Sequence, residues 1–181
     1  MGIGDSLKRR AVFLDRDGVI NRALVRSGKP YPPANLFELE MLPRVSEALK
    51  KLKSAGFELI VVSNQPDVAR GTTSRAEVEA INACLGRILP IDEFRICYHD
   101  GGDGCLCRKP APGMLLDASR ERGLDLAESF MVGDRWRDIE AGRRAGCKTF
   151  FLDYGYDEKR PEAYDYCVRS LWEAACIIAP E

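Results

Sequence analysis

Residues 11–18 read Ala-Val-Phe-Leu-Asp-Arg-Asp-Gly, an apolar run that ends in two carboxylates, Asp15 and Asp17. A short continuous apolar run is typical of a strand buried on both faces of a parallel sheet. In open α/β sheets, ligands bind just past the carboxyl ends of such strands. Two carboxylates at that position predict a site for a metal ion or a covalent intermediate. The same residues also fit a helix N-cap and an Asp-Gly turn, so the motif alone leaves both interpretations open.

Apolar runs and amphipathic segments alternate along the 181 residues. Strands are predicted over residues 11–14, 58–63, 94–98, 129–133 and 148–152. Helices are predicted over residues 45–54, 74–88, 114–122, 137–145 and 171–178. This alternation predicts a single Rossmann-like α/β domain over residues 1–181, with a mainly parallel sheet and helices on both faces. No insertion is long enough for a large cap domain, but the irregular segment 21–43 is expected to lie over the site.

The composition excludes several classes of partner. The chain has 27 basic and 28 acidic residues, so no basic field favours nucleic acid. No apolar run approaches the roughly 18 residues of a membrane span. Residues 1–10 lack the apolar segment of a secretion leader. We therefore expect a cytoplasmic protein that acts on a small molecule. Because the sequence has no heptad pattern, we expect a monomer.

Polar side chains follow several of the predicted strands. They are Ser63 and Asn64 after the second strand, Arg108 and Lys109 after the third, and Asp134 and Asp138 after the fourth. In a parallel sheet these side chains converge on one edge. Clustered carboxylates stay ionised best around a cation, and their hard oxygens favour Mg²⁺. Lysine and arginine beside them suit phosphoryl oxygens, so the set predicts phosphoryl transfer.

A second cluster surrounds the only histidine of the sequence. Cys97, His99, Cys105 and Cys107 lie within eleven positions and suit a tetrahedral zinc ion. The alternative is a surface loop with free thiols. Four protein ligands leave no open coordination position, so the zinc ion is predicted to be structural. Its loop, residues 97–107, would hold Arg108 and Lys109 in place. The other four cysteines are expected to be small buried side chains: Cys84, Cys147, Cys167 and Cys176.

Four motifs, in order along the chain, resemble those of the haloacid dehalogenase (HAD) superfamily. They are Asp15-x-Asp17-Gly18, Ser63, Lys109, and Gly133-Asp134 with Asp138. The resemblance implies that Asp15 attacks phosphorus and forms an aspartyl phosphate. It implies that Asp17 is the general acid toward the leaving alcohol and then the base toward water. Ser63 and Lys109 would hold the transferring phosphoryl group.

The same resemblance implies the magnesium ligands. They would be Asp15, the backbone carbonyl of Asp17, and Asp134. Asp138 would either bind Mg²⁺ through water or position Lys109, and the sequence leaves both roles open.

The zinc loop and the residues after it narrow the resemblance to two groups of HAD proteins. The loop followed by Arg108-Lys109-Pro110 resembles heptose-bisphosphate and histidinol-phosphate phosphatases. Residues 111–114, and Asn64-Gln65 followed by residues 69–71, are similar to the heptose branch. This implies removal of the 7-phosphate of D-glycero-D-manno-heptose 1,7-bisphosphate, with Asn64, Arg108 and Lys109 binding the substrate. The alternatives are a phosphatase of histidinol phosphate or another small molecule, and a non-catalytic HAD-like binding protein.

The sequence leaves the roles of two further segments undecided. Trp136 and Arg137 either form part of the pocket wall or pack at a helix start. Residues 154–160 are expected to be a surface loop without an assigned function.

Overall fold

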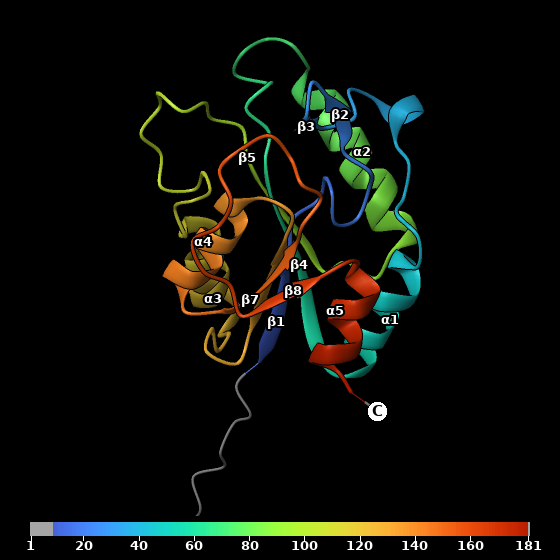
Figure 1. The fold of residues 1–181 in the computed structure, drawn as a ribbon, viewed down its shortest axis with the longest axis vertical. Coiled ribbons are helices and arrows are strands. Elements are labelled where there is room, and N and C mark those ends of the chain that lie inside the picture. Colours follow the sequence, from blue (N-terminus) through green and yellow to red (C-terminus); the bar gives the residue numbers. More distant parts are fainter. Residues whose placement is uncertain (1–8, 181) are drawn as a thin grey trace, which may run out of the picture.

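A six-stranded parallel sheet forms the centre of the structure (Figure 1). The computed structural model describes residues 9–180. Residues 1–8 and residue 181 lie outside the described part, and so does most of the 1–10 segment discussed above as a possible secretion leader. The strand order is β5-β4-β1-β6-β7-β8, which places the Asp15 strand between two neighbours. The strands are β1 (Arg10–Leu14), β4 (Phe57–Asn64), β5 (Glu93–Cys97), β6 (Phe130–Gly133), β7 (Lys148–Leu152) and β8 (Tyr166–Val168).

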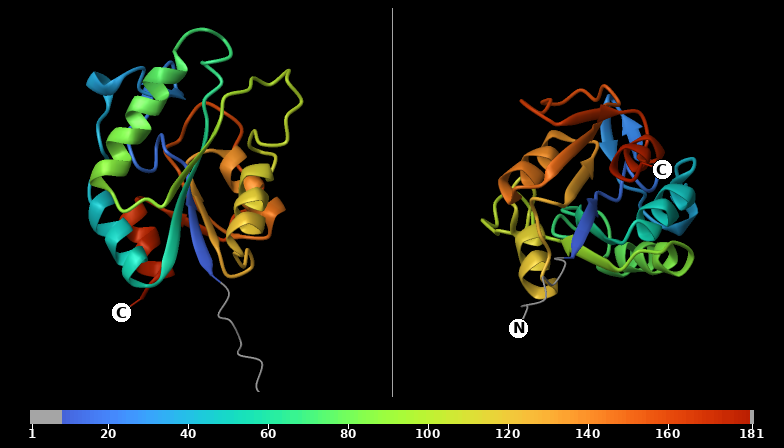
Figure 2. Two further views of the ribbon diagram at one scale, coloured as in Figure 1. Left: turned by 180° about the vertical axis from the view of Figure 1, so that it is seen from behind. Right: turned by 90° about the horizontal axis from the view of Figure 1, so that it is seen from below.

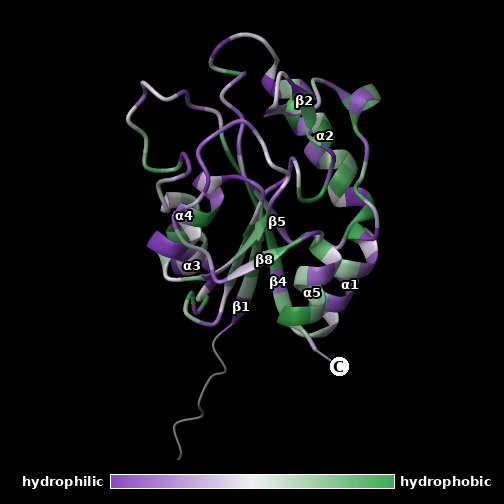
Figure 3. Cartoon of the chain, in the orientation of Figure 1, coloured by the Kyte–Doolittle hydropathy of each residue, from purple (hydrophilic) through white to green (hydrophobic). Residues whose placement is uncertain are grey.

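Helices cover both faces of this sheet (Figure 2). The five α-helices of the described part are α1 (Val45–Ser54), α2 (Arg75–Ile88), α3 (Gly113–Arg122), α4 (Trp136–Ala145) and α5 (Leu171–Ile178). Alternate residues of β1 enter two separate cores: Val12 and Leu14 pack with α1, α2 and α5, whereas Ala11 and Phe13 pack with α3 and α4. The strands are accordingly apolar, while the helices carry one apolar and one polar side (Figure 3).

The predicted elements are confirmed, with every boundary within one residue of its predicted position. Ser129 is excluded from β6 because its hydroxyl accepts a hydrogen bond from the Ala11 amide, at 3.0 Å. The short edge strand β8 was missed, since its apolar run of three residues is shorter than the four to eight typical of a strand; two of the three residues are exposed. One of these is Cys167, so its prediction as a buried side chain was wrong; Cys147 is buried, and Cys84 and Cys176 are partly buried.

The segment 21–43 is more ordered than the sequence predicted. It contains an antiparallel hairpin, β2 (Leu24–Arg26) and β3 (Lys29–Tyr31), and a short helix, η1 (Leu36–Glu38). The hairpin turn needs positive φ at both central residues, Ser27 (48°) and Gly28 (74°). Because only this hairpin and η1 separate β1 from α1, no large cap domain is inserted there.

Gly142 permits the close packing of α4 on the sheet. A Cβ at this position would lie 2.6 Å from Cβ of Met131 and 3.0 Å from Cγ2 of Thr149. We expect Gly142→Ala to lower the free energy of unfolding by about 1–3 kcal/mol, although alanine is the better helix former. Urea denaturation measures this change.

Gly86→Ala in α2 is the matched control, because its Cβ would meet only the Phe94 ring, at 3.3 Å. A Gly142→Ala protein at least as stable as the parent would contradict this account of the α4 contact.

Candidate active site

One pocket opens at the carboxyl ends of the central strands. Its wall brings together residues from β1, β4, the loop before α3, the start of α4 and the hairpin. The residues that line it are Asp15, Asp17, Ala23, Pro30, Tyr31, Pro32, Ser63, Asn64, Pro66, Arg108, Lys109, Asp134, Arg135, Arg137 and Asp138. Every predicted catalytic, substrate-binding and magnesium residue is therefore placed at a single site. The hairpin lies over it, as expected of segment 21–43.

Lys109 is the central cation of the pocket and is only 2% exposed. Its Nζ lies 2.9 Å from Oδ1 of Asp15 and 2.6 Å from Oδ1 of Asp138. It also donates to the carbonyl of Val62 at 2.7 Å. These three contacts use all three protons of the ammonium group. Asp138 thus positions Lys109, one of the two roles that the sequence left open.

Asp134 has one buried carboxylate oxygen without a hydrogen-bond partner among the described residues. Oδ2 accepts a hydrogen bond from the Tyr156 hydroxyl at 2.9 Å, whereas Oδ1 is buried and finds no partner among the described residues. Oxygens of Asp15, Asp134 and Asp138 all lie within 4.8 Å of one another. Buried oxygens are otherwise hydrogen-bonded, and carboxylates grouped in this way are ligands that Mg²⁺ prefers. The residues present fit a magnesium ion.

Gly18 makes this arrangement possible. A Cβ at position 18 would lie 1.9 Å from Oδ2 of Asp134, and φ is +89° there. Only glycine lets the chain after Asp17 pass so close to the Asp134 carboxylate.

Burial and mutual repulsion govern the ionisation of these groups. Burial, and after it the nearby Asp138, raise the pKa of Asp15 to about 7, while Lys109 opposes the shift. Burial, Asp15 and Asp138 raise the pKa of Asp134 in the same way. Burial alone would lower the pKa of Lys109, but Asp138 and Asp15 outweigh it and raise that pKa. One lysine does not compensate three buried carboxylates, so the site favours a further cation.

Four donors hold the carboxylate of Asp17. Arg16 donates from Nε at 3.1 Å and from Nη2 at 3.2 Å, Asn21 from Nδ2 at 2.9 Å, and Gln65 from Nε2 at 2.8 Å. Gln65 also donates to the hydroxyl of Ser63 at 2.9 Å. Sequence reasoning missed Arg16, Asn21 and Gln65, although all three adjoin the predicted motifs. They fix the orientation of Asp17 and link it to Ser63.

Asn64 holds the backbone of Lys109 on both sides. Its Nδ2 donates to the Lys109 carbonyl at 2.9 Å, and its Oδ1 accepts from the Lys109 amide at 3.1 Å. The side chain therefore connects the end of β4 to the lysine loop. Asn64 also lines the pocket, and its predicted contact with substrate stays a prediction.

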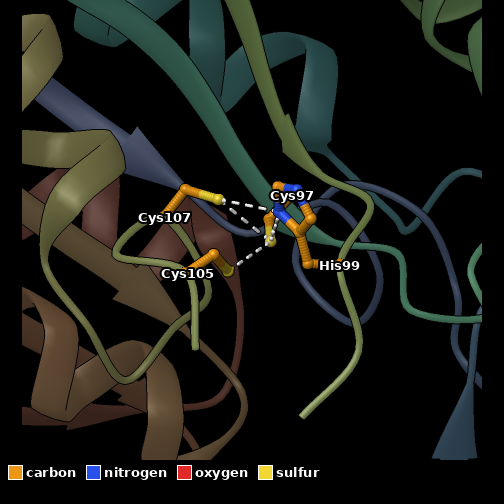
Figure 4. A group of neighbouring side chains, drawn as sticks. All are labelled: Cys97, His99, Cys105 and Cys107. Atoms are coloured by element: carbon orange, nitrogen blue, oxygen red, sulfur yellow. Dashed lines mark hydrogen bonds between the residues drawn. The ribbon is translucent and has the colours of Figure 1, made fainter. Parts of the chain in front are cut away.

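The three cysteines and the histidine of the loop converge on one point (Figure 4). Sγ of Cys97 lies 3.2 Å from Sγ of Cys107, 3.7 Å from Sγ of Cys105 and 3.6 Å from Nδ1 of His99. In tetrahedral zinc with Zn–S bonds of about 2.3 Å, neighbouring ligand atoms are about 3.8 Å apart. Arg108 donates to the His99 carbonyl at 3.0 Å, so the cluster adjoins the pocket wall.

Three arginines form the basic wall of the pocket. They are Arg108, Arg135 and Arg137. Arg135 is bound by Glu158, with Nε 2.9 Å from Oε1, but Arg137 lies 3.9 Å from the same carboxylate. Arg137 is part of the pocket lining, whereas Trp136 is not. The side chains of Arg137 and Lys159 lie over the Trp136 ring.

Residues 154–160 form a loop, as the sequence predicted, and three of their side chains, to which no function was assigned, contact the site. Tyr156 donates to Asp134, and the Tyr154 hydroxyl donates to the carbonyl of Gly18 at 3.0 Å. Glu158 binds Arg135. Nothing in the local sequence places these side chains in the site, because the contacts depend on how the chain returns after β7.

Comparisons with known proteins agree with this geometry. A HAD-hydrolase-like family model matches residues 106–174. A D-glycero-beta-D-manno-heptose-1,7-bisphosphate 7-phosphatase of Bordetella bronchiseptica is 35% identical over 158 residues, 83% of this chain and 84% of the relative. The chain belongs to the HAD-like phosphatases. An alpha-heptose 7-phosphatase of Photorhabdus laumondii is 32% identical over 157 residues, 80% of this chain and 82% of the relative.

The solved structures include one of the same HAD-like phosphatases. The B. bronchiseptica D,D-heptose 1,7-bisphosphate phosphatase, complexed with magnesium and phosphate, superimposes with a TM-score of 0.78 and 30% identity. The match covers 92% of this chain and 96% of that structure. The chain is accordingly a phosphoric monoester hydrolase with the α/β fold of the family.

Other expectations are tested less directly. No helix in residues 9–180 is long and apolar enough to cross a membrane. The cytoplasmic location and the monomeric state stay predictions.

The raised pKa of Asp15 predicts how stability depends on pH. With a pKa of about 7 folded and about 4 unfolded, the folded state binds more protons between those values. Asp15 should therefore make the free energy of unfolding in Mg²⁺-free buffer fall as pH rises through this window, by up to about 1.4 kcal/mol per pH unit, and Asp134, whose pKa is also raised, adds to the fall. Urea denaturation between about pH 5 and pH 7 measures the slope.

Asp15→Asn is the control and should reduce this slope, as should excess Mg²⁺, which favours the carboxylate. If the parent and Asp15→Asn share the same pH dependence, Asp15 does not have the raised pKa.

Proposed function

We propose that the protein is a Mg²⁺-dependent phosphatase that removes the 7-phosphate of D-glycero-D-manno-heptose 1,7-bisphosphate. The observation behind this proposal is Lys109, held between Asp15 and Asp138 beside the unpartnered oxygen of Asp134. The named activity of the relatives supports the choice of sugar. The relatives include enzymes for both anomers at C1, so both are candidate substrates.

In the proposed reaction an oxygen of Asp15 attacks phosphorus, and the bond from phosphorus to the sugar oxygen breaks. Asp17 supplies the proton that the leaving alcohol takes up. Asp17 then takes a proton from water, which attacks phosphorus and frees phosphate from Asp15. Ser63 and Lys109 bind the phosphoryl oxygens, Lys109 with the proton that it donates to Asp15 when no substrate is present.

Mg²⁺ would be held by Asp15, Asp134 and the backbone carbonyl of Asp17. When bound, it supplies positive charge that offsets the repulsion between the phosphoryl oxygens and the Asp15 carboxylate.

The shape and charge of the pocket favour a bisphosphate. The three arginines of this wall face two carboxylates: Glu158, which pairs with Arg135 and lies 3.9 Å from Arg137, and Asp100, which lies 4.0 Å from Arg108 and is shared with Arg70. Arginine binds phosphate through two parallel hydrogen bonds, so Arg108 and Arg137 suit a second phosphate. The apolar part of the lining includes Ala23 and the hairpin residues Pro30, Tyr31 and Pro32, and it suits the carbon skeleton of the sugar.

Substrate comparison tests the proposal. We expect Mg²⁺-dependent phosphate release with a much higher kcat/KM for one anomer of heptose 1,7-bisphosphate than for histidinol phosphate. Asp15→Asn, purified in parallel, should show no turnover and so excludes a contaminating phosphatase. A preference for histidinol phosphate, or uniformly weak turnover, would overturn the heptose assignment.

Arg108 is predicted to recognise the second phosphate. Loss of a charged hydrogen-bond pair costs about 1.5–3 kcal/mol, so Arg108→Ala should lower kcat/KM for the bisphosphate roughly 10- to 150-fold. Hydrolysis of heptose 7-phosphate, which lacks the second phosphate, should change far less. Arg120→Ala, at an exposed surface arginine, is the control. An equal loss on both substrates would assign Arg108 to the reacting phosphate or to the loop instead.

We further propose that Cys97, His99, Cys105 and Cys107 bind a structural zinc ion. The convergence of the four ligand atoms supports this assignment, and four protein ligands leave no position for substrate. The hydrogen bond from Arg108 to the His99 carbonyl would transmit the order of the zinc loop to the pocket.

Removal of zinc should therefore lower both stability and activity. We expect near-equimolar zinc in the purified protein by elemental analysis, and a lower melting temperature and kcat/KM after chelation. Zinc, but not Mg²⁺ alone, should restore them. Cys105→Ser should lose zinc, whereas Cys84→Ser, outside the cluster, should keep it. Zinc-free protein with full stability and activity would refute the site.

A further inference from the structure

Tyr156 touches the predicted magnesium site from a segment that belongs to none of the four HAD motifs. Its hydroxyl donates to Oδ2 of Asp134 at 2.9 Å, and the other oxygen of that carboxylate is the buried, unpartnered Oδ1. We propose that Tyr156 is a positioning residue that orients Asp134 so that Oδ1 faces Mg²⁺. This inference rests on the magnesium site of the proposed function.

Asp134 needs such a donor because its surroundings repel it. Oxygens of Asp15 and Asp138 lie within 4.8 Å of an Asp134 oxygen, and these two carboxylates share the single positive charge of Lys109. Lys109 has no hydrogen-bond contact with Asp134 among the described residues; its ammonium contacts Asp15, Asp138 and Val62. A phenol is a neutral donor that fixes a carboxylate without adding a competing cation.

The segment that carries Tyr156 is itself anchored at several points. Asp157 donates its amide to the carbonyl of Gly28 at 2.8 Å, which joins the segment to the β2–β3 hairpin. Glu158 binds Arg135, the residue next to Asp134. The Tyr154 hydroxyl donates to the Gly18 carbonyl at 3.0 Å. Contacts on both sides of Tyr156 along the chain therefore hold the segment in place, and with it the hydroxyl that binds Asp134.

The position of the segment agrees with this function. After β7 the chain first passes the carboxyl edge of the sheet and then returns to the start of β8, which is parallel to β7 (Figure 1). The hydrogen bond to Asp134 spans 22 residues of sequence, so no local turn accounts for it.

The test is a calorimetric titration of the full protein with Mg²⁺ alone. Removal of a group that orients a metal ligand typically weakens binding 10- to 100-fold, so Tyr156→Phe should raise the Mg²⁺ dissociation constant by about tenfold or more. In steady-state assays the Mg²⁺ concentration for half-maximal rate should rise by the same factor, while kcat at saturating Mg²⁺ stays near that of the parent.

Controls separate positioning from folding. Tyr164→Phe changes a tyrosine later in the chain whose ring lies against Phe151, and it should leave Mg²⁺ binding unchanged. The melting temperature of Tyr156→Phe in Mg²⁺-free buffer shows whether the variant is folded. If it is not folded, Tyr156→His is used in its place, because histidine retains a ring N–H donor. Tyr156→His should bind Mg²⁺ more tightly than Asp134→Asn.

An unchanged Mg²⁺ dissociation constant in folded Tyr156→Phe would overturn the inference, as would a loss of kcat with Mg²⁺ affinity preserved. The titration contains no sugar phosphate, so an incorrect substrate leaves its outcome readable. A parent protein that fails to bind Mg²⁺ would instead refute the metal site of the proposed function.

Discussion

Lys109 is buried between two carboxylates that come from different parts of the fold, Asp15 after β1 and Asp138 in α4. A buried charge is tolerated only when it is paired and hydrogen-bonded, so this lysine fixes the relative positions of the sheet edge and α4. It also makes it possible to keep several carboxylates in one buried site. The remaining negative charge creates the demand for a divalent cation.

Much of the surrounding structure keeps that lysine and its partners in place. Asn64 binds both sides of the Lys109 backbone from the end of β4. The Cys/His loop leads directly into Arg108 and Lys109. Gly18 and Gly142 permit the close approaches that bring the Asp loop to Asp134 and α4 to the sheet. Elements distant in sequence therefore serve a single constraint at the pocket.

The sequence predicted the parts of the site that have local patterns. The apolar run before Asp15 and the periodic helices define the parallel sheet, and the carboxyl-edge rule then brings Ser63, Lys109 and Asp134 together. The contacts of Tyr156 and Gln65 were not predictable, because they depend on side-chain orientation and on a return of the chain after β7. The hairpin and β8 were missed since short, exposed strands carry no apolar periodicity.

Asp15, as the proposed nucleophile, becomes phosphorylated during turnover. Borohydride reduces an acyl phosphate to an alcohol, so quenching the reacting enzyme should convert Asp15 to homoserine. Mass spectrometry of the peptide containing residues 11–18 would detect this change. We predict homoserine at position 15 only when both substrate and Mg²⁺ are present. Reduction at another carboxylate, or active turnover with no reduced residue, would contradict the account.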